Sequence, residues 1–274
     1  MFITEKLIYI QMQKTGCTHI ASLLTNLFDG EQIGKHNAAS SVQINSNSYF
    51  ISSIRNPWDW YLSLWTYGVQ GKGGLMERLT NKNYRTVVTR ALRNPIKDST
   101  ILQDLRDEIT KDVSLWRDVY GESDNVESFR NWLKQIHDPR NSRWLGEGFG
   151  RSTISEFCGF MSFRYLYLCC SNPPDSNFSR LISNYTDLVQ FDKKFSYIDF
   201  FIRQECLEED FCKAIGKIRT LNNEEKTQIF SGKKTNSSKR PLSVIDYYDR
   251  ESIDLIYNRD RLIIEKFEYS PPNI

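Results

Sequence analysis

The sequence lacks several features that would each assign it to a class of proteins. No apolar run approaches the roughly 20 residues that a membrane-spanning helix needs, and residues 1–6 lack the pattern of a signal peptide. The 36 basic and 34 acidic residues nearly cancel, so no charge excess indicates nucleic-acid binding. The six cysteines form no CxxC pair, which disfavours zinc and favours reduced thiols. We therefore expect a cytoplasmic protein that binds no metal, nucleic acid or membrane, and the sequence leaves its oligomeric state open.

The composition is that of a chain that buries a core: 39% of the 274 residues are hydrophobic and 26% are charged. Two strand–loop–helix units open the chain. Residues 7–11 form an apolar run followed by helical spacing over 20–28, and residues 49–54 form a second run followed by a helix that begins at Pro57. Tandem units of this kind predict parallel strands covered by helices.

The remainder of the chain predicts further elements of the same fold. We expect a helical insertion at about 68–150, strands at 165–170 and 197–202, and helices at 205–218 and 249–267. The predicted fold class is therefore α/β, with a central parallel sheet flanked by helices, in a single domain over residues 1–274 that carries the insertion.

The first candidate site is the run Gln-Lys-Thr-Gly-Cys-Thr at residues 13–18, between the first strand and its helix. Free backbone N–H groups and the helix dipole attract an anion at such a position. Gly16 allows a close backbone approach, Lys14 adds a positive charge, and Thr15 and Thr18 add hydroxyl donors. The lysine precedes the glycine, so this is not a Walker A loop. A solvated turn without a ligand is the alternative interpretation.

The second candidate site follows the next strand. Arg55-Asn-Pro57 stands at its carboxyl end, where open α/β sheets bind ligands, and the Arg55 guanidinium can fork onto a phosphate. Ser63 lies about two helical turns farther on. Either residue alone would be an ordinary surface side chain, but the repeated strand-to-helix position favours a second anion site.

Together these motifs resemble the two cofactor signatures of the sulfotransferases that use 3′-phosphoadenosine 5′-phosphosulfate (PAPS) as donor. Their 5′-phosphosulfate loop is similar to residues 14–18, and their 3′-phosphate motif is similar to Arg55-Asn-Pro57 with Ser63. Residues 200–211, 236–240, 247–249 and 267–269 resemble later parts of the group that includes carbohydrate-modifying members. The resemblance leaves residues 68–195 uncovered, and Cys17 and His19 depart from the commoner residues.

The resemblance implies a P-loop NTPase-like sulfotransferase fold and a set of site residues. The donor-binding residues would be Lys14, Thr15, Gly16, Cys17, Thr18, His19, Arg55, Ser63, Ser238, Lys239 and Arg240. Lys14 would also be catalytic, because it would stabilise the bridging oxygen as the leaving 3′-phosphoadenosine 5′-phosphate (PAP) gains charge. A flexible basic loop around Lys239 and Arg240 would close over the donor, with a solvated run of surface charge as the alternative interpretation.

The acceptor needs a base, and His36 is our candidate. It lies between the first helix and the second strand, the region from which members of the family bring a catalytic histidine or carboxylate, and an imidazole with a pKa near 6.5 suits proton abstraction. A plain polar loop remains the alternative for His36. We interpret His19 as a packing residue, His137 as part of an acceptor segment or a solvated loop, and Glu31 as a weaker base.

The acceptor itself is not specified by the sequence. A small molecule or a glycan with a hydroxyl or amine is expected from the resemblance. Stacking on it is one interpretation of Trp116, Trp132 and Trp144, but single tryptophans at such spacing more often belong to the core. Two other functions remain open: a protein that binds PAP or PAPS without turnover, and a P-loop kinase.

Overall fold

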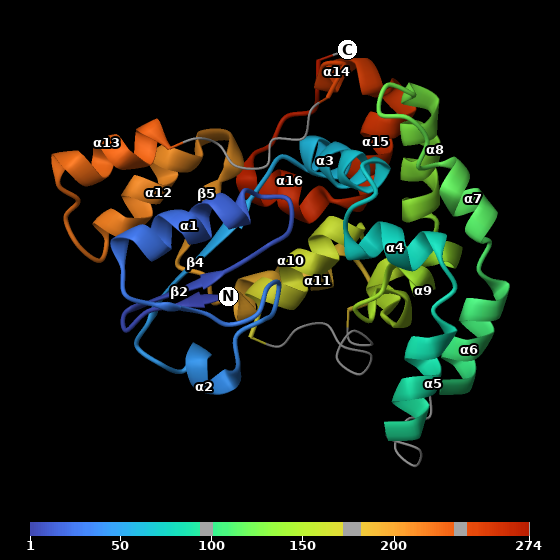
Figure 1. Cartoon of the computed structure of the whole chain (residues 1–274), viewed down its shortest axis with the longest axis horizontal. Helices are drawn as coiled ribbons and strands as arrows, with labels where there is room; N and C mark the ends of the chain where they lie inside the picture. Colours follow the sequence, from blue (N-terminus) through green and yellow to red (C-terminus); the bar gives the residue numbers. More distant parts are fainter. Residues whose placement is uncertain (94–100, 172–181, 233–239, 274) are drawn as a thin grey trace.

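The centre of the fold is a five-stranded sheet with the order β3-β1-β2-β4-β5 (Figure 1). We analysed a computed structural model, which describes residues 1–93, 101–171, 182–232 and 240–273. Strands β2 (Leu7–Ile10), β4 (Tyr49–Ile54) and β5 (Phe200–Arg203) run parallel. Strands β1 (Phe2–Ile3) and β3 (Glu31–Gln32) pair antiparallel at one edge. The α/β class and the parallel centre are confirmed, but the sheet as a whole is mixed.

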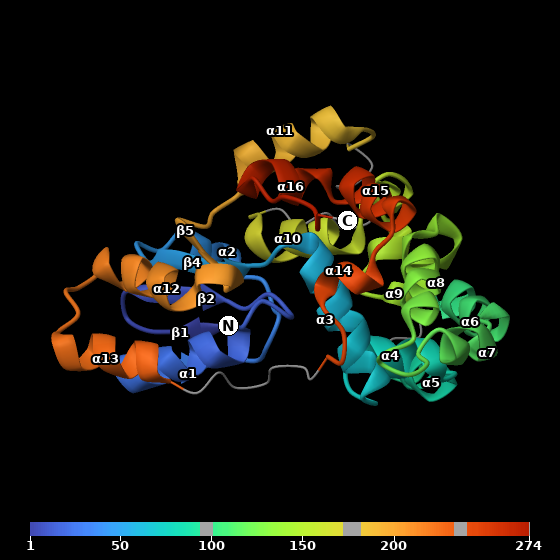
Figure 2. The ribbon, with the colours of Figure 1, turned by 90° about the horizontal axis from the view of Figure 1, so that it is seen from above.

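Both faces of this sheet are covered by helices (Figure 2). Side chains alternate along β2, so Leu7 and Tyr9 belong to one apolar cluster while Ile8 and Ile10 belong to the other. Helices α1 (Cys17–Leu27), α12 (Leu207–Gly216) and α13 (Asn223–Ser231) cover the first face; α10 (Phe160–Cys169) and α16 (Arg261–Phe267) lie against the second. Burial on both faces explains why β2 reads as an unbroken apolar run.

Residues 165–170 were predicted to be a strand, but 165–169 belong to helix α10, so this prediction is wrong; only Cys170 is extended, in an isolated bridge to Ser196. Nine of the ten residues of α10 are buried. A helix that is apolar on every side has no polar stripe to mark a 3.6-residue period, and a short apolar run of this kind reads equally well as a buried strand. The predicted strand at 197–202 is confirmed in part, since β5 begins at Phe200, and the helix at 205–218 corresponds to α12.

The predicted closing helix at 249–267 is broken into α15 (Arg250–Arg259) and α16 at Asp260. The Asp260 carboxylate is fully buried and accepts hydrogen bonds from the Ser162 amide at 2.8 Å and the Tyr61 hydroxyl at 2.7 Å. These bonds tie the break to α10 and to α3 (Pro57–Val69), which favours the interruption over a continuous helix.

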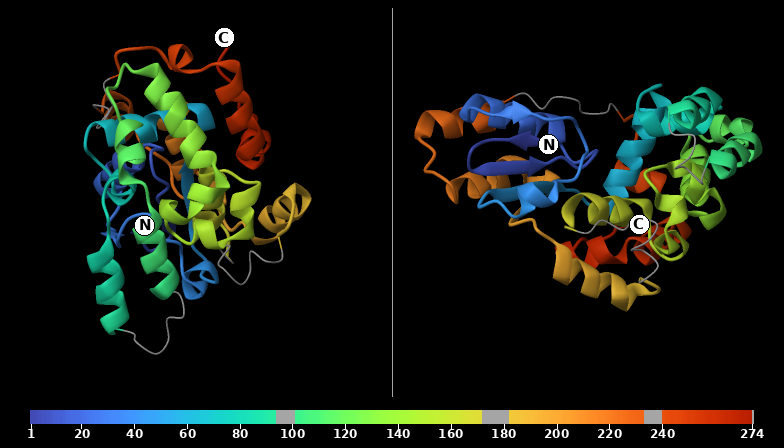
Figure 3. Two further views of the ribbon diagram at one scale, coloured as in Figure 1. Left: turned by 90° about the vertical axis from the view of Figure 1, so that its right-hand side faces the viewer. Right: turned by 90° about the horizontal axis from the view of Figure 1, so that it is seen from below.

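The described part of the predicted insertion at 68–150 consists of helices joined by turns and contains no strand. It lies beside α3, beyond the carboxyl ends of the parallel strands (Figures 1 and 3). Its helices are α4 (Gly74–Thr80), α5 (Tyr84–Arg93), α6 (Ile101–Thr110), α7 (Val113–Asp118), α8 (Val126–His137) and α9 (Ser142–Leu145). The remaining helices are α2 (Ser41–Ile44), α11 (Tyr185–Phe195) and α14 (Val244–Tyr247), with 3₁₀ turns at Pro139–Asn141, Phe149–Arg151, Thr153–Glu156 and Gln204–Cys206.

The tryptophans of the insertion are packing residues. Trp116 and Trp132 are fully buried, and Trp144 donates its indole N–H to the Asp107 carbonyl at 2.8 Å. None of the three lines the cavity described below. The interpretation of these residues as part of the core is therefore supported over stacking on an acceptor. Within the described residues, every helix is too short or too polar to cross a lipid bilayer.

Candidate functional site

A cavity of about 870 Å³ lies where the segments after β2 and β4 meet α3 and the insertion. Strands β2 and β4 are adjacent and parallel, with Ile10 opposite Ser52, so their carboxyl ends open at the same edge of the sheet. The volume falls in the range of small-molecule sites, about 300–1,000 Å³. Lys14 and Arg55 both line this cavity, so the two predicted anion sites meet in one place.

The loop after β2 has an unusual backbone. Lys14 has a φ of 62° and Gly16 a φ of 82°, both in the left-handed region. A Cβ on Gly16 would lie 2.6 Å from Leu207 Cδ1, so the glycine is required by space as well as by conformation. Helix α1 then begins, and its first intrahelical bond runs from Ile20 N to Gly16 O at 3.1 Å. The preceding amides form a helix N-terminus beside the cavity, as an anion site requires.

Three groups hold this loop in place. Arg55 Nη1 donates to the Lys14 carbonyl at 3.0 Å, and Trp60 Nε1 donates to the Gln13 carbonyl at 2.7 Å. The Thr15 hydroxyl donates to the Met12 carbonyl at 2.8 Å, lies 2.6 Å from the Ser53 hydroxyl and is fully buried. The predicted hydroxyl contribution of Thr15 to the anion site is therefore wrong, because that hydroxyl is buried and bonds to Met12 and Ser53. Cys17, Thr18 and His19 do line the cavity.

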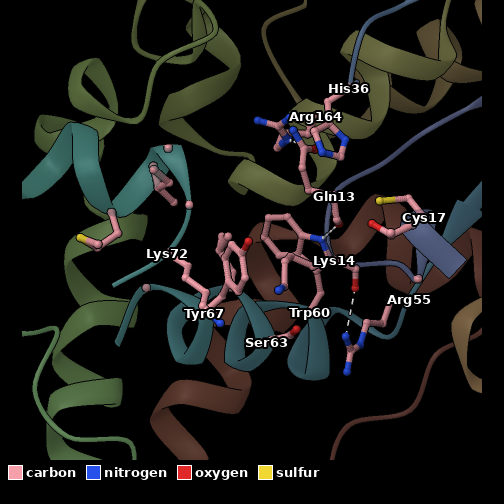
Figure 4. A pocket seen from close by; sticks show the side chains of 18 of the residues that line it. Gln13, Lys14, Cys17, His36, Arg55, Trp60, Ser63, Tyr67, Lys72 and Arg164 are labelled. Atoms are coloured by element: carbon pink, nitrogen blue, oxygen red, sulfur yellow. Dashed lines mark hydrogen bonds between the residues drawn. The ribbon is translucent and has the colours of Figure 1, made fainter. Parts of the chain in front are cut away.

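The side chain of Lys14 lies inside the cavity (Figure 4). Its Nζ stands 3.8 Å from the centroid of the Tyr67 ring, a cation–π contact. Burial and then the charge of Arg55 lower the pKa of Lys14 to about 8. The lysine is thus a charged group that its surroundings stabilise poorly, and an anion at its Nζ would stabilise it.

Arg55 is buried and its guanidinium is already engaged. Its Nε donates to Asp59 at 2.7 Å, and its Nη2 bonds to the same carboxylate oxygen. Arg240 Nη1 donates to the other Asp59 oxygen at 2.6 Å. Burial opposes ionisation of Asp59, but the charges of Arg55 and Arg240 outweigh it and lower the carboxyl pKa. The fork of Arg55 therefore binds Asp59 in this structure, and its contact with a phosphate stays a prediction.

The other predicted 3′-phosphate residues have different outcomes. Ser63 is buried on α3 and lines the cavity, and so does Arg240. Ser238 and Lys239 lie outside the described residues.

His36 lines the cavity and lies close to Arg164 (Figure 4). Its Nδ1 is 2.9 Å from the Gln11 carbonyl, which can only accept, so Nδ1 carries the hydrogen and Nε2 keeps its lone pair. Burial, with a smaller effect from the Arg164 charge, lowers the pKa of His36. A neutral imidazole with a free Nε2 is the form that a general base requires.

The other candidate bases have different surroundings. His19 Nε2 lies 3.5 Å from Glu208 Oε1 where α1 meets α12. His137 is buried away from the cavity, with its ring 4.7 Å from that of Tyr61, so the solvated-loop alternative for it is wrong, while an acceptor-binding role stays a prediction. Glu31 is exposed on the edge strand β3 and does not line the cavity.

Several residues of the cavity were not predicted. Tyr67 follows Ser63 by four residues on α3, so the helical period could have indicated it. Lys72 belongs to the Gly-rich connection after α3, Arg164 lies in the segment predicted as a strand, and Glu147 lies in the insertion. Among the described residues that line the cavity, seven are lysine or arginine and two are glutamate, a balance that favours a polyanionic ligand.

Comparison of the chain with protein-family models, with curated proteins and with solved structures finds no match. The interpretation of the site therefore depends on its own geometry and chemistry.

Proposed function

We propose that the chain is a sulfotransferase of the P-loop NTPase-like sulfotransferase fold, which transfers a sulfuryl group from PAPS to a hydroxyl or amine of an acceptor. One observation carries the proposal. Two segments with the residue types of anion sites, 41 residues apart in the sequence, line one cavity and contact each other through Arg55 Nη1 and the Lys14 carbonyl. A ligand with two separated anionic groups fits that arrangement, and PAPS is such a ligand.

The cavity supports a definite orientation for the donor. The 5′-phosphosulfate would lie at the N-terminus of α1 beside Lys14, where backbone amides and the ammonium group both favour negative charge. The 3′-phosphate would lie at Arg55, Ser63 and Arg240. At that position it would replace Asp59 as a partner of the two guanidinium groups, so one anion would be exchanged for another.

The chemical step needs positioning and charge stabilisation. The acceptor oxygen attacks sulfur as His36 Nε2 takes the hydroxyl proton, an oxygen–sulfur bond forms, and the bond from sulfur to the 5′-phosphate oxygen breaks. PAP leaves with the electron pair of that bond. The Lys14 ammonium would stabilise the charge that develops on the leaving oxygen, a contribution worth about 3 kcal/mol for comparable donors.

The donor preference is tested by thermal unfolding with nucleotides. PAP at about 100 times its Kd adds about 2.7 kcal/mol of stability, and for a domain of this size we expect the Tm to rise by roughly 5 °C. ADP with magnesium serves as the control, because it lacks the 3′-phosphate that Arg55, Ser63 and Arg240 would bind. If ADP with magnesium stabilises the protein and PAP does not, the proposal is wrong and a kinase is favoured.

Turnover is tested with labelled PAPS and a panel of hydroxylated and amino acceptors. We expect Lys14→Ala to reduce transfer by about 10²–10³-fold. His36→Ala should lower kcat while the Kd for PAP stays within about twofold of the unsubstituted protein. Lys6→Ala is a matched control, because Lys6 is exposed and outside the cavity. Unchanged kcat in His36→Ala would remove His36 from the mechanism, and PAP binding without transfer to any acceptor would favour the non-catalytic alternative.

A further inference from the structure

The cavity contains more positive charge than the proposed donor position uses. Four of the seven lining cations are outside that position: Lys35, Lys72, Arg78 and Arg164. The two glutamates that line the cavity, Glu147 and Glu208, leave this half with a net positive charge even when both are ionised. Lysine and arginine side chains that line a shared cavity repel one another, so a second anionic group would stabilise the arrangement.

Arg164 is the most informative of these cations, because it is buried and only partly bonded. It is 5% exposed and stands on α10, where its Nε donates to Gln13 Oε1 at 2.6 Å. Its Nη1 is paired with the Glu147 carboxylate. Within the described residues its buried Nη2 has no hydrogen-bond partner. Buried charged donors are normally satisfied, so the unsatisfied Nη2 would gain a hydrogen bond from a ligand oxygen brought beside it.

The guanidinium of Arg164 lies beside His36, the proposed base. Figure 4 shows Arg164 next to His36 on one side of Lys14, with Arg55 on the other side. Arg78 reaches the same cavity from α4 across Gly146, where an added Cβ would lie only 1.4 Å from Arg78 Nη1. An acceptor whose hydroxyl faces His36 would therefore have its neighbouring substituents near two guanidinium groups.

Resting on the proposed function, we propose that the acceptor is itself an anion, a hydroxyl compound that carries an oxyanion such as a carboxylate or a sulfate ester, and that Arg164 Nη2 binds this group. Guanidinium donors bind carboxylate and sulfate oxygens by charge-assisted hydrogen bonds. Arg78, Lys35 and Lys72 add long-range attraction for the same charge. A hydroxyl of a neutral sugar would offer Nη2 only an uncharged acceptor, and that bond is weaker than a charge-assisted one, so the site favours the oxyanion.

The proposal is tested by calorimetric titration of the PAP-saturated protein. The probes are glucuronate and inorganic sulfate, with glucose as the neutral match for glucuronate and sodium chloride at equal ionic strength as the salt control. We expect both oxyanions to bind at least tenfold more tightly than glucose. The probe that binds more tightly identifies the anionic group of the acceptor: glucuronate indicates a planar carboxylate, and inorganic sulfate indicates a tetrahedral sulfate ester.

Three substitutions test whether the Arg164 guanidinium binds the oxyanion. Arg164→Gln should weaken the oxyanions at least tenfold while the Kd for PAP changes by less than about threefold. Arg78→Gln changes an exposed side chain, so folding is not at risk, and should weaken them by a smaller factor. Glu147→Gln frees Nη1 of Arg164 and should strengthen binding. These opposite directions separate a direct contact from a general loss of structure.

The outcomes distinguish the two proposals. If PAP binds but glucuronate and sulfate bind no better than glucose, or if Arg164→Gln binds them as tightly as the unsubstituted protein, the anionic acceptor is refuted and the donor assignment stands. If PAP itself fails to bind, the proposed function is refuted, and the acceptor proposal fails with it.

Discussion

The proposed enzyme should lose activity at mildly alkaline pH, because Lys14 loses its charge there. An ordinary lysine would still be charged at that pH. The pKa of Lys14 is lowered to about 8 by burial and by the charge of Arg55. The perturbation is a change of pH from 7 to 9. Other groups of the site keep their charge over that interval, since phosphate monoesters are already doubly ionised and burial raises the pKa of the neighbouring Cys17 thiol.

The size of the effect follows from the titration of one group. With a pKa of about 8, Lys14 is about nine-tenths protonated at pH 7 and about one-tenth protonated at pH 9, so kcat/KM for PAPS should fall about tenfold. A lysine with its usual pKa of about 10.4 would lose only a few per cent of its charge over the same interval. The lowered pKa of His36 adds an ascending limb below about pH 6.5, so the full profile should be bell-shaped.

The assay is the initial rate of transfer from labelled PAPS at low donor concentration, which reports the pKa values of the free enzyme. Lys14→Arg is the control, because a guanidinium keeps its charge across this range. That variant should react more slowly than the unsubstituted protein but show no decline between pH 7 and 9. A descending limb near pH 10 in the unsubstituted protein, or a limb near 8 that survives in Lys14→Arg, would refute the reasoning.

Three further substitutions test the construction of the site and the fold. Gly16→Ala places a Cβ 2.6 Å from Leu207 Cδ1 at a left-handed backbone position. We expect the free energy of unfolding in urea to fall by about 1–3 kcal/mol, and an unchanged value would contradict the close contact. Asp59→Asn removes the carboxylate that two guanidinium groups share, so PAP should bind more tightly by calorimetry; weaker binding would mean that Asp59 orients them for the ligand. Asp260→Asn places an amide donor where the fully buried carboxylate accepts two hydrogen bonds. A loss of about 1–3 kcal/mol in the free energy of unfolding should lower the Tm by several degrees. An unchanged Tm would show that the break between α15 and α16 does not depend on this carboxylate.

The elements that the sequence predicts well are those with a local signal. Strand β4 matches its predicted range, and α3 begins at Pro57 as expected, because alternation, helical period and a proline at the first turn are properties of neighbouring residues. Helix α10 was misassigned because a fully buried helix has no polar face to mark its period. The break at Asp260 depends on partners in α3 and α10 that are distant in the sequence.

The sequence by itself determined which two segments are the candidates for anion binding, since the loop after β2 and the residues after β4 carry their chemistry in adjacent positions. Only the tertiary structure decided that they share one cavity, that the Thr15 hydroxyl faces the sheet and that the Arg55 fork grips Asp59. It also brought Arg164, from a segment about 150 residues downstream, to Gln13 and the cavity. The physical reason is that a hydrogen bond or an ion pair depends on separation in space, which packing sets, whereas sequence patterns record only separation along the chain.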